Sequence, residues 1–200
     1  MQNARMTTQP RLYGPERSRF AALAVLAAAL IAGTAAGAPA KPDAAIAVIA
    51  AAPIKDLTVA DAYPAGELRW LLWSDGAAAD RAVHLALYRR AGGAAVQTWA
   101  NGWRGAYDPA LRQIEDWRYA GHPVSAVTMQ RGAATAQLDL YGLNAADEPV
   151  RLAEKSATSV SWAVGADGKP VLILYAAAAG GTLTASCYAW NGELAAFPCP

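Results

Sequence analysis

The sequence predicts an all-β fold with one short helix. The expected architecture is an antiparallel sheet system, a sandwich or a partial, propeller-like barrel, built from about three repeated β-hairpins. Three observations lead there: apolar and polar residues alternate in short segments from Leu68 onward, turn-forming residues interrupt these segments, and a hairpin pattern recurs. Alternation with a period of two is typical of strands with one buried face, and Gly, Pro, Asn and Asp favour turns.

Residues 1–40 have the features of an export signal. A basic beginning is followed by an apolar run over 20–31, and Ala38-Pro39-Ala40 provides small residues before a cleavage point. This order predicts a cleavable secretory signal peptide, with Lys41 as the new N-terminus and a periplasmic or extracellular destination. The alternative is an uncleaved anchor over 20–36, a stretch barely long enough to span a bilayer.

The rest of the chain divides into a leader and a domain. Residues 41–66 are rich in Ala and Pro and predict a leader segment with one short strand at Ala45–Ala50, and residues 67–200 predict a β-rich globular domain. Residues 41–200 contain 13 Lys and Arg against 15 Asp and Glu. A nearly neutral domain lacks the basic surface that nucleic acids or anionic membranes attract. We therefore expect no nucleic-acid partner and, after signal cleavage, no membrane partner.

Self-comparison reveals three similar segments, which begin at Arg81, His122 and Lys169, at spacings of 41 and 47 residues. Each consists of a strand, a Gly-containing turn and a second strand that ends near an Asn, which predicts a repeated β-hairpin. Propeller blades have periods in this range, although three copies are too few to close a propeller. Because Val171–Tyr175 is apolar throughout, we expect a central strand covered on both faces.

The expected helix is Asp108–Trp117. Asp108 is a capping residue, and Pro109 suits the first turn of a helix. Leu111, Ile114 and Trp117 recur every three residues, which favours a single buried helical face.

Cys187 and Cys199 are the only cysteines and lie near the end of the chain. In an oxidising compartment, two lone cysteines so close together predict a disulfide that fixes the C-terminal tail.

The binding hypothesis concerns large aromatic residues. The sequence has seven Trp, and the connection between the first two hairpins concentrates four rings, those of Trp99, Trp103, Tyr107 and Trp117. Exposed rings in this segment could stack on sugars or anchor a protein. The alternative is that they fill a core otherwise made from small Ala side chains.

Other candidate sites have simpler structural explanations. His122 precedes a strand, and His84 lies in one without a metal-ligand partner at suitable spacing. Asp167-Gly168 and Asp75-Gly76 are typical of turns rather than calcium loops. No metal site, cofactor motif or catalytic residue is assigned from the sequence.

Three functions compete at this point. The favoured one is a secreted or periplasmic, non-enzymatic β-domain that binds a protein or glycan partner. The alternative is an extracytoplasmic hydrolase of cell-wall or extracellular polymer, with Asp108, Glu115, Asp116 or His122 in its site, since glycosidases use paired carboxylates. The third is a structural module whose repeats pair with other chains. The sequence sets no oligomeric state.

Overall fold

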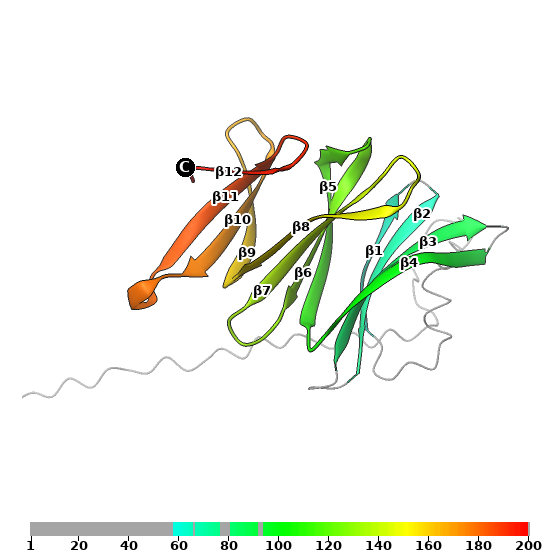
Figure 1. Cartoon of the computed structure of the whole chain (residues 1–200), viewed down its shortest axis with the longest axis horizontal. Helices are drawn as coiled ribbons and strands as arrows, with labels where there is room; N and C mark the ends of the chain where they lie inside the picture. The colour runs from blue at the N-terminus through cyan, green and yellow to red at the C-terminus, as the bar shows by residue number, and fades with distance from the viewer. Residues whose placement is uncertain (1–57, 66, 77–80, 92–93, 200) are drawn as a thin grey trace, which may run out of the picture. The chain divides into compact units, whose positions relative to one another are not determined.

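A computed structural model describes residues 58–65, 67–76, 81–91 and 94–199. In these residues twelve strands form three antiparallel sheets of four strands each (Figure 1), and the only helical element is a 3-10 turn at Ala179–Gly181. The all-β prediction is therefore confirmed. The predicted signal peptide and the strand at Ala45–Ala50 lie outside the described residues.

Each sheet is a meander in which strands pair in chain order. The first sheet contains β1 (Thr58–Ala65), β2 (Leu68–Asp75), β3 (Ala82–Ala91) and β4 (Ala94–Arg104). The second contains β5 (Tyr107–Tyr119), β6 (His122–Gln130), β7 (Ala136–Leu143) and β8 (Pro149–Ala157). The third contains β9 (Ser159–Val164), β10 (Pro170–Ala177), β11 (Leu183–Trp190) and β12 (Leu194–Phe197). β1, which pairs with β2, lies within the segment that the sequence assigned to the leader.

The predicted helix at Asp108–Trp117 is wrong, because this segment forms most of β5. Two irregularities in the pairing of β5 with β6 fall between Tyr107 and Ala110 and between Ile114 and Arg118. Asp108, whose φ is 48°, and Pro109 lie in the first of them, where the strand loses regular pairing and tolerates a proline.

The helix-like spacing has a different origin. Residues three apart in a regular strand point to opposite faces, and Leu111 and Ile114 accordingly belong to two separate cores. The second irregularity then brings Trp117 to the same face as Ile114. A strand that is buried on both faces and carries a bulge thus reproduces the three-residue spacing of a buried helix.

The second sheet lies between two apolar cores. One core joins it to the first sheet and contains residues of β2, β3 and β4 together with Tyr141 and Leu143 of β7. The other core joins it to the third sheet and contains Leu138 and Leu140 of β7 together with Leu172 and Leu174 of β10. All eight residues of β7 are buried. The alternation in β7 predicts one solvent-facing side, and this is wrong because both faces are covered.

Indole rings join the second sheet to the third. Trp117 stacks on Trp190, with ring centroids 5.8 Å apart, and meets Trp162 edge-on at 5.5 Å. The indole N–H of Trp117 donates to the carbonyl of Pro170, and that of Trp190 donates to the carbonyl of Arg118. The buried indole N–H of Trp117 is therefore satisfied across the interface, as buried polar groups require.

Two of the three predicted hairpins occupy equivalent places. β6–β7 and β10–β11 are the middle pair of the second and third sheets, whereas the segment from Arg81 forms β3–β4, the last pair of the first sheet. The equivalent of β6–β7 in the first sheet is β2–β3. The structural repeat is therefore the whole four-stranded sheet. β10 is an inner strand as expected, although Ile173 and Tyr175 on its outer face remain partly exposed.

Cys187 and Cys199 form the predicted disulfide, with their Cα atoms 5.1 Å apart. It ties the tail after β12 to β11, and its presence fits an extracellular or periplasmic protein. Among the described residues, no helix is long and apolar enough to cross a membrane.

Candidate functional site

A cleft lies where the first sheet meets the loop between β7 and β8. Its volume is about 430 Å³, within the range of ~300–1,000 Å³ typical of small-molecule sites. We call it the Trp99 cleft. The lining residues come from β3, β4, the β7–β8 loop and the start of β8, and are Arg89, Thr98, Trp99, Ala146, Asp147, Glu148 and Pro149.

A bulge in β4 forms one wall. Leu87 pairs with Trp99 and Tyr88 pairs with Gln97, so Thr98 is an extra residue in the ladder. Its hydroxyl donates to the Leu87 carbonyl at 3.1 Å. Bulges re-aim side chains and are common beside functional sites. The bulge lets two consecutive residues, Thr98 and Trp99, line the same cleft.

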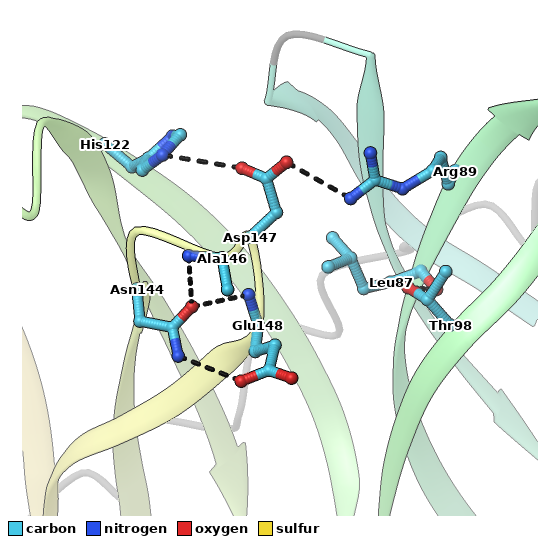
Figure 2. Close-up of polar contacts among 8 residues, drawn as sticks. All are labelled: Leu87, Arg89, Thr98, His122, Asn144, Ala146, Asp147 and Glu148. Carbon is cyan, nitrogen blue, oxygen red and sulfur yellow. Dashed lines mark hydrogen bonds and ion pairs between the residues drawn. The ribbon is translucent and has the colours of Figure 1, made fainter.

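The opposite wall is a tightly hydrogen-bonded loop. The side-chain oxygen of Asn144 accepts from the backbone N–H groups of Ala146 and Glu148, each at 2.9 Å, and its amide nitrogen donates to the Glu148 carboxylate at 3.1 Å (Figure 2). The backbone N–H of Asp147 donates to the Asn144 carbonyl. Asp147 has a φ of 62°, a left-handed conformation that Asp tolerates better than most residues. One asparagine thus fixes both acidic residues of the cleft.

Asp147 lies between two basic side chains, as Figure 2 shows. Its Oδ2 accepts from Nη2 of Arg89 at 3.1 Å, and its Oδ1 is 3.6 Å from Nε2 of His122. All three side chains are partly exposed, and ion pairs of this kind contribute only about 0–1 kcal/mol to stability. The ion pairs of Asp147 with Arg89 and His122 therefore do more to orient polar groups at the cleft than to hold the sheets together.

Two other aromatic rings contact Trp99. It meets Trp70 edge-on at 5.9 Å and Tyr141 edge-on at 5.4 Å, and it packs against the core between the first and second sheets while remaining partly exposed. The Tyr141 hydroxyl accepts from Nδ2 of Asn101 at 2.8 Å. A partly exposed ring that is fixed by neighbouring rings can contact an apolar part of a ligand without reorganising.

A buried polar group lies deeper between the same two sheets. Asp139 on β7 is 0% exposed, and Gln137 donates to its Oδ2 at 3.0 Å. Burial raises the pKa of Asp139 above its usual range, and the neighbouring carboxylate of Glu154 adds to the shift. Burial also raises the pKa of Tyr141 to about 12. Burial therefore shifts both groups toward their neutral forms, and the ring of Tyr141 contacts Trp99 in the wall of the cleft.

The four rings of the binding hypothesis do not gather on one surface. Trp99 lines the cleft, Trp103 is buried in the core of the first sheet, and Trp117 is buried against the third sheet. Tyr107 is partly buried, and its hydroxyl donates to the Gly132 carbonyl at 2.8 Å. Of these rings, Trp99 is the one that lines the cleft.

The acidic residues of the hydrolase alternative lie elsewhere. Asp108, Glu115 and Asp116 are exposed positions on β5, and Glu115 pairs with Arg118 at 3.4 Å. His84 stacks on Trp73 and pairs with Asp75 at 3.2 Å in the first sheet. Among the described residues, no group of three or more His, Cys, Asp or Glu is arranged to hold a metal ion.

Sequence reasoning missed Arg89, Asp147 and Glu148. Arg89 and Asp147 are separated by 58 residues and meet only because the first two sheets pack together. The available signal was Asn144, which the hairpin repeat aligns with Asn191. Both follow the second strand of a hairpin and accept backbone N–H bonds from the next residues, and only Asn144 has acidic residues three and four positions later.

No protein-family model matches the chain, and neither a curated protein nor a solved structure matches it.

Proposed function

We propose that this chain is an exported, non-enzymatic domain that binds a saccharide in the Trp99 cleft. A cleavable signal peptide ending at Ala40 would deliver it to the periplasm or the extracellular space, where its disulfide is stable. The observation that carries the proposal is the composition of the cleft: one partly exposed indole beside a guanidinium, two carboxylates and a hydroxyl.

Saccharides combine the two properties that this cleft matches. The C–H face of a sugar ring is apolar and stacks on an indole, while its hydroxyl groups require paired donors and acceptors at the rim. Arg89 offers N–H donors, and Asp147 and Glu148 offer acceptors from a loop fixed by Asn144. Because that loop is held by five hydrogen bonds, little ordering entropy is lost on binding.

A glycan is favoured over a protein partner for two reasons. The cleft is concave and small, whereas stable protein interfaces bury roughly 800 Å² on each side. It also contains one aromatic ring among polar groups, whereas protein hot spots are clusters of large, fully desolvated side chains.

The test is calorimetric titration of the exported domain with defined oligosaccharides: chito-, cello-, xylo- and manno-oligomers and peptidoglycan fragments. We expect at least one to bind, and we expect Asp147→Asn and Arg89→Ala each to weaken it about 10-fold or more, since a hydrogen bond to a charged group contributes about 1.5–3 kcal/mol. Asn tolerates the left-handed backbone at 147, so this variant changes charge with little effect on the loop.

Asp167→Asn is the matched control, because Asp167 is an exposed turn residue of the third sheet whose carboxylate, like that of Asp147, lies near a basic side chain, that of Lys169 at 3.8 Å. It should bind like the wild type. Absence of binding across the panel, or equal loss in D147N and D167N, would contradict the proposal. Release of shortened oligosaccharides during incubation would instead favour the hydrolase alternative.

A further inference from the structure

One face of β8 carries a row of polar side chains that points toward the first sheet. In the pairing with β7, Arg151 lies opposite Tyr141 and Glu154 lies opposite Asp139. Tyr141 packs in the core between the first two sheets, and directly opposed residues share a face of their sheet. Ser156 lies two residues after Glu154 and shares the same face. We call Arg151, Glu154 and Ser156 the β8 row.

The first sheet covers this face of β7 but leaves the β8 row open. Trp99 and Asn101 of β4 both contact Tyr141, which is buried. The side chains of Arg151 and Glu154, by contrast, are 51% and 48% exposed. Ser156 is exposed as well. The β8 row is therefore an accessible polar surface beside the strand that carries Trp99.

The β8 row begins where the Trp99 cleft ends. Pro149, the first residue of β8, lines the cleft, and Arg151 follows two residues later. On the other wall, Trp99 contacts Tyr141, the cross-strand partner of Arg151. The strand from Pro149 to Ser156 has a length of roughly 20 Å, which exceeds that of a single sugar ring. The cleft and the β8 row can therefore contact one extended ligand.

The position of β8 at the edge of its sheet does not account for these polar residues. Inward-pointing charges are one way in which proteins protect an edge strand. β9 and β12 are the edge strands of the third sheet, yet Val160, Trp162 and Leu194 on these strands pack against the second sheet. Edge strands of this fold can thus present apolar residues to the neighbouring sheet, and β8 does not.

The charges beside the cleft favour an uncharged ligand. Arg151 pairs with Glu154 at 2.8 Å, and Arg89 pairs with Asp147 at 3.1 Å. Each guanidinium therefore already has a carboxylate partner, and an acidic ligand would have to displace it. A hydroxyl group can accept from a guanidinium and donate to a carboxylate without separating the pair. The surface suits a ligand that is rich in hydroxyl groups and carries no charge.

We propose that the ligand is a linear, neutral oligosaccharide of several units, an inference that rests on the saccharide site proposed above. One unit stacks on Trp99 in the cleft, and the following units lie along β8, where Arg151 and Glu154 bind their hydroxyl groups. Most of the translational and rotational entropy is lost when the first unit binds, so each further unit that makes contacts adds affinity. Affinity should therefore increase with chain length.

The experiment is calorimetric titration of the exported domain with disaccharides to hexasaccharides of the N-acetylated chito-, cello-, xylo- and manno-series. In at least one series we expect affinity to rise about 10-fold or more from the disaccharide to the hexasaccharide. Glu154→Gln removes a charge at nearly constant size and should weaken hexasaccharide binding about 5-fold, with no effect on the disaccharide. Glu115→Gln is the matched control, because Glu115 is exposed on β5 and pairs with Arg118 three residues away at 3.4 Å, as Glu154 pairs with Arg151. It should bind like the wild type.

A measurement on the wild type protects the test against misfolded variants. The backbone amide NMR signals of Arg151 and Glu154 should shift with the hexasaccharide and not with the disaccharide. Affinity that is independent of chain length, or equal loss of hexasaccharide binding in E154Q and E115Q, would overturn the extended site and leave the saccharide proposal standing. Tighter binding of an oligogalacturonate than of every neutral hexasaccharide would overturn the neutral ligand. Absence of binding by every oligomer would overturn both proposals.

Discussion

Asp139 is the residue whose surroundings differ most from its sequence pattern. It alternates with Leu138 and Leu140 and would face water if its strand covered a single core, yet it is fully buried between the first two sheets. One carboxylate oxygen accepts from Gln137, while Glu154 lies opposite on β8. Two carboxylates in neighbouring strands repel each other, and burial penalises the charged form further. Folding therefore shifts Asp139 toward its protonated form relative to the unfolded chain.

This environment predicts a pH dependence of stability. Because the pKa of Asp139 is raised in the folded state, the folded protein binds more protons than the unfolded chain in the window between the ordinary and the raised pKa. The contribution of Asp139 to stability is thus present at low pH and is lost as pH rises through the folded-state pKa. Asp139→Asn removes this titration, so the stability of the variant relative to the wild type should increase from about pH 4 upward. Urea unfolding of both proteins from about pH 4 to pH 8 measures this difference in the free energy of unfolding.

A stability difference that instead shrinks as pH rises would mean that the ionised carboxylate is stabilised in the fold. In that case the hydrogen bond from Gln137 and the interactions with Arg151 and Trp103, which favour ionisation of Asp139, outweigh burial.

At the scale of the strand, Gly142 of β7 shows how closely the elements of the second sheet approach. A Cβ atom built at this position would lie 2.7 Å from Cδ1 and 2.9 Å from Cβ and Cγ of Tyr119. Tyr119 ends β5 and pairs with His122 across a two-residue turn, Ala120-Gly121, in which both residues have positive φ. Turns of this kind fix the twist of a hairpin, so the backbone of Tyr119 has little freedom to move away from Gly142.

Gly142→Ala should therefore lower the free energy of unfolding by about 1–3 kcal/mol, the usual cost of overpacking. In a Tyr119→Ala background the same change should cost at least about 0.5 kcal/mol less, because the contacts with Cδ1 and Cγ of the ring are absent and only the contact with Cβ remains. Denaturant unfolding of the wild type, the two single variants and the double variant measures both costs. Equal costs in both backgrounds would show that the ring does not pack over Gly142.

The strands also show what the sequence could and could not predict. The fold class and the disulfide were predictable because alternation, turn residues and cysteine spacing are local signals. β5 was misassigned because the period of its buried residues reflects two cores and a bulge, both of which depend on other sheets. The Trp99 cleft was inaccessible for the same reason: it is formed between β4 and a loop that follows β7, and of its residues the sequence indicated only Trp99.

At the scale of the molecule, Trp117 of the second sheet makes several contacts with the third sheet. Trp117 contacts Trp162 and Trp190 and donates to Pro170, and it is 2% exposed. Trp117→Ala should lower stability by about 3–5 kcal/mol, as truncation of a buried aromatic does. Arg112→Ala removes only an exposed cation above Trp162 and should cost about 0.5–1 kcal/mol.

Thermal or urea unfolding of both variants tests this prediction. Near-equal stability of W117A and R112A would mean that the indole cluster does not join the sheets and that the third sheet is held by other contacts.

The proposal that the Trp99 cleft binds a saccharide depends on the same packing of sheets. The first sheet provides the ring and Arg89, and the second sheet provides Asp147 and Glu148. A binding site between sheets uses residues that no single sheet contains, which is where ligand sites on rigid scaffolds commonly occur.

The most direct measurement is a two-dimensional NMR titration that follows the seven indole N–H signals while the tightest-binding oligosaccharide of the panel is added. The account predicts that the Trp99 signal shifts first and saturates with the binding curve, while those of Trp117, Trp162 and Trp190 stay in place. Shifts confined to the indoles of the third sheet, with Trp99 unmoved, would contradict it.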